Sequence, residues 1–199
     1  MNPTNLTIYQ GRTFSQVFRW STLPYLYEAI TAITQTGPVS ITCAAHGLTP
    51  NWPVAVVSVK GMTQINALHN PPRDSEMNPC SVVDPNTITI NNINSALFAA
   101  YVSGGYLQFY TPVDMTGYTA SMSIKDRVGG TSLLSLSTVA GSIIIDNTNK
   151  SVTLALTPAI TAALAWTKGV YDIEMIAPTG VSYPLAYGTV TVTDAVTLP

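Results

Sequence analysis

The sequence predicts an all-β protein in which one β-sandwich is interrupted by a second, smaller β-module. Short β-branched runs bounded by Gly, Pro, Asn or Asp recur along the chain, as they do in proteins made of short strands and tight turns. Helical periodicity is weak. Two segments, 20–27 and 105–114, lose the alternation of strands and are expected to join two modules. Since 46% of the 199 residues are apolar, the chain can form folded cores.

The first half of the chain is expected to hold several closely spaced strands. Residues 6–20 alternate apolar and polar side chains on either side of Gly11, which predicts a hairpin or a bulged strand. Asp84, Pro85 and Asn86 have turn chemistry, because Pro fixes φ and Asn tolerates the position that follows. Four further strands are expected at Val39–Cys43, Val54–Val59, Ser81–Val83 and Thr87–Ile90.

The second half is expected to form a sandwich, because six short strands follow one another at regular spacing. The Asn-rich tip 146–150 can bond its own backbone and close a hairpin. Helices are expected at Ile93–Val102, capped by Asn91 or Asn92, and more clearly at Thr157–Trp166, where Thr is followed by Pro. The six strands are Tyr118–Lys125, Ser142–Asp146, Val152–Leu156, Gly169–Ile176, Val181–Tyr187 and Thr189–Thr193.

The two joins divide the chain into a split domain and an insertion. Residues 1–26 and 110–199 are expected to form the sandwich, which would dock and assemble, and residues 27–109 are expected to form the inserted module. An insertion of this length is compatible with a small independent domain.

The low charge content limits the classes of partner that the chain is expected to bind. Only 8 basic and 10 acidic residues are present, 9% of the chain where about 25% is typical, so much of the surface is neutral and suits a protein packed in an assembly. A net charge of −2 without a Lys/Arg cluster argues against nucleic acid as a partner. No apolar run approaches the roughly 20 residues of a membrane span, and no signal peptide is visible. We therefore expect a chain that is neither membrane-inserted nor secreted.

The sequence contains few residues in patterns that support catalysis or metal binding. His46 and His69 are the only histidines, and Cys43-x-x-His46 is half of a zinc motif that His69 and Cys80 do not complete, because structural zinc normally uses two tight ligand pairs. Acidic residues are scattered, and no phosphate loop or nucleophile elbow is present. We expect no enzyme, no cofactor and no metal, and we expect Cys43 and Cys80 to be buried free thiols.

Aromatic residues gather at the two joins and are the best candidates for recognition. Tyr and Phe supply large, stiff contact areas that often dominate binding, but aromatics at such joins also pack modules together, and both interpretations stay open. The candidate interface comprises Tyr25, Tyr27, Trp52, His69, Arg73, Tyr106, Phe109 and Tyr110.

Several motifs of the split domain resemble a known family. The opening LTIYQGRTFSQVFRW, DMTGYTA at 114–120, TPAITAAL at 157–164, YDIE at 171–174 and GTVTV at 188–192 are similar to the Ig-like β-sandwich of tailed-phage virion proteins, in particular the N-terminal domain of siphophage upper baseplate proteins. The resemblance covers residues 1–26 and 110–199. It implies an Ig-like β-sandwich interrupted by a small β-barrel-like inserted domain.

The insertion has a resemblance of its own. GPVSITCAAHGLTPNWPVAVVSVKGMTQIN at 37–66, CSVVDPNTITI at 80–90 and YVSGGY at 101–106 are similar to a small β-module of phage tail and fibre proteins, named after the first catalytic cysteine half-domain of ubiquitin-activating enzyme. No cysteine catalysis is implied. The Pro-rich stretch Ala67–Pro79 departs from the pattern and is the expected place for a specific contact.

These resemblances imply a non-enzymatic structural component of a tailed-bacteriophage virion. It would be a tail, baseplate or neck (collar) protein, assembled in the host cytoplasm as a threefold or sixfold homo-oligomer that contacts other virion structural proteins. Two alternatives remain: a host receptor- or glycan-binding module that uses Trp52 or residues 67–79, and a capsid decoration protein.

Overall fold

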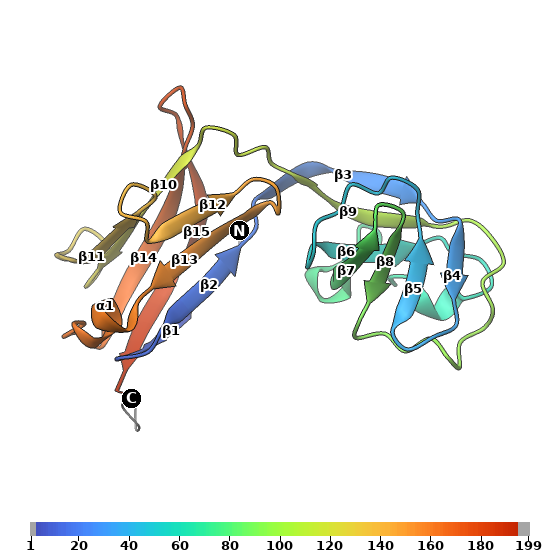
Figure 1. Cartoon of the computed structure of the whole chain (residues 1–199), viewed down its shortest axis with the longest axis horizontal. Coiled ribbons are helices and arrows are strands. Elements are labelled where there is room, and N and C mark those ends of the chain that lie inside the picture. The colour runs from blue at the N-terminus through green and yellow to red at the C-terminus, as the bar shows by residue number, and fades with distance from the viewer. Residues whose placement is uncertain (1–2, 195–199) are drawn as a thin grey trace. The chain divides into compact units, whose positions relative to one another are not determined.

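The computed structural model describes residues 3–194, and the chain is all-β, as predicted. It divides into two compact units (Figure 1). We call the first the sandwich unit; it includes the residues up to Trp20 and those from Asp114 onward. The second, the inserted unit, is Ser21–Val113. Each unit has a separate apolar core.

The sandwich unit places a five-stranded sheet, in the order β1-β15-β14-β10-β11, over a three-stranded sheet, in the order β12-β13-β2 (Figure 1). Both sheets contribute alternate side chains to one core, for example Ile173 from the larger sheet and Leu154 from the smaller. The strands are β1 (Leu6–Tyr9), β2 (Phe14–Phe18), β10 (Thr119–Lys125), β11 (Ser132–Ser137), β12 (Ile143–Asp146), β13 (Ser151–Leu156), β14 (Lys168–Ile176) and β15 (Ser182–Thr193).

The opening segment is neither a hairpin nor a bulged strand, and this expectation was wrong. β1 pairs in parallel with β15, with Leu6 opposite Val190, whereas β2 pairs antiparallel with β13. The chain crosses from one sheet to the other at Gly11, whose φ of 69° suits glycine. Apolar and polar side chains alternate in both β1 and β2, because the two strands lie in opposite sheets and each packs one side against the same core.

Gly188 is not a break between two strands, as the sequence suggested, but lies inside the continuous strand β15. A Cβ at this position would lie 2.2 Å from the carbonyl oxygen of Thr4. The glycine therefore permits a close backbone approach instead of a turn.

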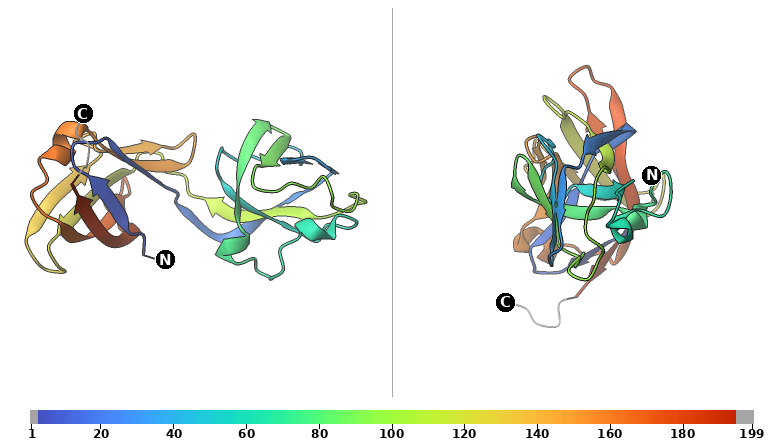
Figure 2. Two further views of the ribbon diagram at one scale, coloured as in Figure 1. Left: turned by 90° about the horizontal axis from the view of Figure 1, so that it is seen from below. Right: turned by 90° about the vertical axis from the view of Figure 1, so that its right-hand side faces the viewer.

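The inserted unit is a strongly curled sheet in the order β3-β9-β6-β7-β8-β5-β4 (Figure 2). Its two end strands, β3 and β4, are separated in the chain only by Ile30 and Thr31, so one stretch of chain borders both ends of the sheet. Closure of this kind gives a barrel-like module around one core. The elements are β3 (Ser21–Ala29), β4 (Ala32–Thr34), β5 (Val39–Thr42), β6 (Pro53–Val57), β7 (Asn78–Asp84), β8 (Thr87–Ile90), β9 (Tyr106–Pro112), η1 (Thr63–Ile65) and η2 (Asp74–Glu76).

The segments expected to be joins are strands. β3 and β9 pair from Ser21 opposite Pro112 to Ala29 opposite Tyr106, with a register shift between Thr22 and Tyr25. The structure therefore places residues 21–26 and 110–113 in the inserted unit, where the sequence had placed 21–26 and 110 onward in the sandwich. That shift at Leu23 and Pro24 interrupts the alternation and explains why the strand signal was hidden.

One of the two expected helices forms. α1 spans Pro158–Ala162, shorter than expected, and Thr157 caps it by accepting a hydrogen bond from the Ile160 amide. The other expected helix, at 93–102, is an irregular segment. It forms only local turns, such as the bond from the Phe98 amide to the Ser95 carbonyl oxygen. The buried Ser95 hydroxyl instead lies 3.0 Å from the carbonyl oxygens of Thr34 and Thr36.

Cys43 and Cys80 are buried thiols that form no disulfide, as expected, and burial raises the pKa of the Cys43 thiol to about 11. Within residues 3–194, no helix is long and apolar enough to cross a bilayer.

Candidate functional site

The outer side of the β3–β9 pair carries four tyrosines. Alternation along β9 sends Leu107 and Phe109 into the core, where their side chains are buried. The side chains between them face the other way, together with alternate residues of β3. We call this surface the tyrosine face; it consists of Tyr25, Tyr27, Tyr106 and Tyr110.

The tyrosine face is organised as two ring pairs. Tyr25 and Tyr110 lie directly opposite each other, with ring centroids 4.6 Å apart and hydroxyl oxygens 3.0 Å apart. The hydrogen bond from Tyr25 to Tyr110 and burial together raise the pKa of Tyr25 to about 12. Tyr27 and Tyr106 form a T-shaped pair with centroids 6.3 Å apart, and about half of each side chain is exposed. This second pair offers stiff aromatic area to a partner.

Gln108 lies between the two pairs and is 1% exposed. Its register partners are Tyr27 on β3 and Ala55 on β6. The amide nitrogen Nε2 has no hydrogen-bond partner within the described part of the chain. Buried donors usually have a partner, so this amide is an exception among the buried polar groups of the inserted unit.

The loop 67–79 is held by the carboxylate of Glu76. Glu76 accepts hydrogen bonds from the backbone amides of Leu68, at 2.6 Å, and Arg73, at 2.8 Å, and lies 3.1 Å from Nδ1 of His69. The Arg73 amide is the largest of the contributions that lower the pKa of Glu76 to about 2. The negative charge of Asp74, in the same loop, is one of the smaller contributions to the raised pKa of Tyr25. His69 and Arg73 are brought together within this loop by Glu76.

Trp52 and Phe109 do not belong to any exposed surface, and their assignment to the interface was wrong. Trp52 is 1% exposed and Phe109 is 2% exposed, and both pack in the core of the inserted unit. The alternative in which a sugar stacks on Trp52 fails for the same reason. The stretch Thr49–Trp52 forms a turn that directs the indole inward, with the Trp52 amide donating to the Thr49 carbonyl.

His46 has a structural role. Its Nδ1 accepts a hydrogen bond from the Leu48 amide at 3.0 Å, so Nε2 carries the proton and donates to the carbonyl oxygen of Asp84 at 2.9 Å. Both ring nitrogens are therefore engaged in fixing the turn before β6. Among residues 3–194, no three His, Cys, Asp or Glu side chains gather in a way that could hold a metal ion.

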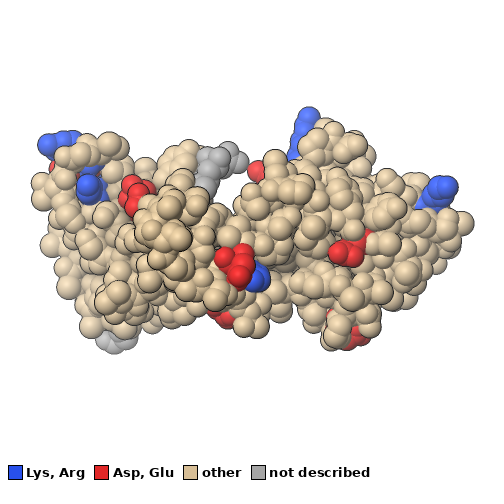
Figure 3. All heavy atoms as spheres, turned by 90° about the horizontal axis from the view of Figure 1, so that it is seen from above, with Lys and Arg blue, Asp and Glu red and all other residues tan. Residues whose placement is uncertain are grey.

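Charged side chains are sparse on the surface shown in Figure 3, which is mostly neutral. The sequence located the tyrosines but missed Gln108 and Glu76. The alternation in YLQFY at 106–110 places Tyr106, Gln108 and Tyr110 on one side of a strand, and this signal could have identified Gln108. Glu76 gave no comparable signal, because its partners are backbone amides of a loop.

No model of a known protein family matches the chain, and no curated protein matches it.

Proposed function

We propose that the chain is a non-enzymatic structural component of a tailed-bacteriophage virion, a tail, baseplate or neck protein that assembles in multiple copies as an adaptor. The observation that carries this proposal is the tyrosine face. Two half-exposed rings, Tyr27 and Tyr106, lie beside the buried amide of Gln108, and Tyr-rich centres with a fixed geometry are typical of protein interfaces.

The sparse charge of the chain supports the same role. With 9% charged residues, neighbouring copies meet little electrostatic repulsion and few charges need to be desolvated on association. Repeated copies of one chain form a closed ring when each uses the same pair of surfaces, and phage tails provide threefold and sixfold axes. We infer a homo-oligomer of three or six copies that contacts other virion proteins.

The resemblance of the sequence motifs of both units to phage virion modules supports a position of the assembly in the tail or neck. The sandwich unit is the part that docks to a neighbouring virion protein. The inserted unit presents the tyrosine face and the loop 67–79 for contacts between copies. This division is compatible with the structure, because each unit has its own core and each surface lies within a single unit.

The virion assignment is tested with antibodies raised against the purified chain. Particles released from cells that carry the gene are purified by density gradient, and labelled particles are imaged by electron microscopy. We expect label at the tail end or the neck. Absence of the chain from purified particles contradicts the proposal, and label distributed over the head would indicate a decoration protein instead.

A further inference from the structure

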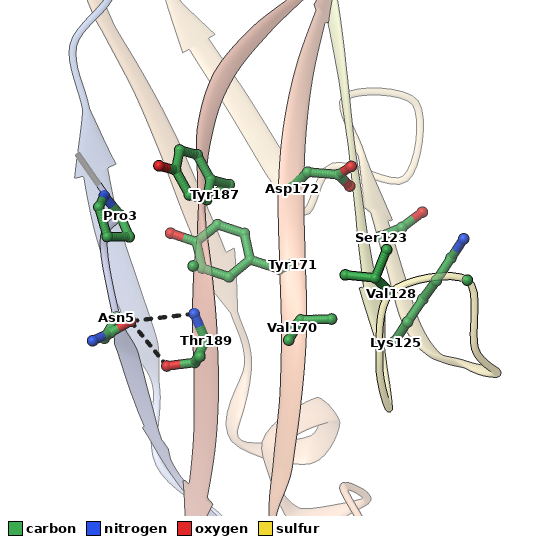
Figure 4. Close-up of a pocket in the computed structure, with 12 residues that line it drawn as sticks. Pro3, Asn5, Ser123, Lys125, Val128, Val170, Tyr171, Asp172, Tyr187 and Thr189 are labelled. Atoms are coloured by element: carbon green, nitrogen blue, oxygen red, sulfur yellow. Dashed lines mark hydrogen bonds between the residues drawn. The ribbon is translucent and has the colours of Figure 1, made fainter. Parts of the chain in front are cut away.

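The sandwich unit has a hollow on the outer side of its five-stranded sheet, with a volume of about 570 Å³ (Figure 4). Strands β10, β14 and β15 form its floor. Pro3 and Asn5, just before β1, border one side, and Val128 in the turn after β10 borders the other. A volume of this size is within the range of sites for small molecules, about 300–1,000 Å³.

The floor of the hollow is built from neighbouring rows of side chains. Ser123, Asp172 and Tyr187 are register partners across β10, β14 and β15, so they form one row. Lys125 and Thr189 lie in the next row, on either side of Val170. Figure 4 shows Tyr187 toward β1, and Ser123, Asp172 and Lys125 toward β10. Tyr171 alternates with Val170 and Asp172 along β14, and its side chain is buried in the core.

The side of the hollow next to β1 is held in place by hydrogen bonds. The hydroxyl of Tyr171 donates to the carbonyl oxygen of Thr4 at 2.7 Å, across the space that Gly188 leaves open. The Asn5 side-chain oxygen accepts from the amide of Thr189 at 3.3 Å and from its hydroxyl at 2.9 Å (Figure 4). These bonds fasten Thr4 and Asn5, just before β1, to β14 and β15, so the wall beside Tyr187 is formed before any ligand binds.

The polar end has unused hydrogen-bonding groups. Asp172 is exposed and Lys125 is half-buried, and in the described part of the chain no ion pair joins them although they lie on neighbouring strands. The carboxylate of Asp172 can accept hydrogen bonds, and the ammonium of Lys125 and the hydroxyl of Ser123 can donate them. The ring of Tyr187, 46% exposed, lies next to Asp172 in the same row.

We propose that this hollow binds a saccharide. A sugar ring has an apolar C–H side, which fits the ring of Tyr187, and a rim of hydroxyls that both donate and accept, which fits Asp172 together with Lys125 and Ser123. An anionic phosphate group is disfavoured, because Asp172 offsets the one lysine. The proposal is independent of assembly through the tyrosine face, since the hollow lies wholly in the sandwich unit.

The test applies the full chain to an array of oligosaccharides that contain glucose, galactose, rhamnose or N-acetylglucosamine. Binders are then titrated in solution while the backbone amides are followed by NMR. We expect at least one saccharide to shift the amides of Asp172 and Tyr187. Tyr187→Ala and Asp172→Asn should each weaken binding by about tenfold or more.

Matched controls exist in the same unit. Tyr9→Ala removes an exposed tyrosine from β1, and Glu174→Gln removes a carboxylate from the same side of β14, and neither residue lines the hollow. Both should change affinity by less than about twofold. The proposal is overturned if no saccharide binds at about 10 mM, if both pocket variants bind like the unaltered chain, or if the shifted amides lie in the inserted unit. Binding of a Pro-rich peptide at this hollow, without any saccharide, would equally overturn it.

Discussion

Tyr25 donates a hydrogen bond to the hydroxyl oxygen of Tyr110 directly across the β3–β9 pair, over a distance of 3.0 Å. Ionisation of Tyr25 removes the donated proton, so this bond holds the residue in its neutral form. The pair therefore connects the geometry of the tyrosine face to a titration that can be measured.

The first prediction concerns this titration. The pKa of Tyr25 is raised from 10.0 to about 12, so the folded state favours the neutral phenol; the resulting stability is present below pH 10 and is lost as the pH rises toward 12. Tyr110→Phe should move the Tyr25 pKa back toward 10, measured by the ultraviolet absorbance of tyrosinate. Tyr106→Phe is the control. An unchanged Tyr25 titration in Tyr110→Phe would contradict the assigned bond.

The second prediction concerns the loop 67–79. Because the pKa of Glu76 is lowered from 4.5 to about 2, its carboxylate stabilises the folded state above pH 4.5, and this contribution is lost as the pH falls toward 2. Glu76→Gln should lose that pH dependence and speed hydrogen exchange at Leu68 and Arg73. Glu174→Gln is the control. The explanation fails if the stability of Glu76→Gln falls between these pH values as steeply as that of the unaltered chain.

The third prediction concerns the contact between β1 and β15. Gly188→Ala should destabilise the chain by about 2–4 kcal/mol, because the added Cβ would lie 2.2 Å from the carbonyl oxygen of Thr4 and would force this backbone to shift. Tyr171→Phe removes one hydrogen bond to Thr4 and should cost about 1 kcal/mol. In Gly129→Ala the added Cβ would have no atom within 4 Å, so this variant measures only the strain of a positive φ. We expect it to lower the free energy of unfolding by about 1 kcal/mol. Urea unfolding measures all three, and equal losses for Gly188→Ala and Gly129→Ala would contradict the close approach.

The fourth prediction concerns the two units. Ser21 and Pro112 are register partners, so the ends of the inserted unit lie side by side, and the unit has its own core. The fragment 21–113 should therefore fold alone, with dispersed NMR signals and a cooperative thermal transition. The sandwich unit, with Trp20 joined to Asp114 by a short Gly-Ser linker, should also fold. An unfolded inserted fragment would show that its core needs the rest of the chain.

The sequence predicted what depends on local pattern. The alternation of β14 and the turns at 84–86 and 146–150 gave correct strands and hairpins, because neighbouring residues determine them. The features that the sequence did not predict depend on pairing between strands that are far apart in the chain. The opening segment looked like a hairpin because both halves alternate, yet their partners are β15 and β13. Gly188 suggested a break between two strands, because nothing in the local sequence reveals that Thr4 packs against it.

The candidate site was predicted in part for the same reason. Aromatic clustering located the tyrosines, but only the pairing of β3 with β9 shows that Tyr25 and Tyr27 share a side with Tyr106 and Tyr110. Trp52 stands beside Asn51 in a loop position, which left open an exposed sugar site or the edge of a core. The turn instead directs the indole into the core, and no local pattern distinguishes these two outcomes.

The most direct test of the assembly role is the mass of the purified chain by light scattering, with negative-stain imaging of the same sample. The proposal predicts particles of three or six times 21.2 kDa with a visible symmetry axis. Tyr27→Ala combined with Tyr106→Ala should weaken association by about 30-fold, the effect of about 2 kcal/mol at an interface centre, whereas Tyr9→Ala should not. A chain that stays monomeric at every concentration, or a double variant that assembles as well as the unaltered chain, would contradict assembly through the tyrosine face.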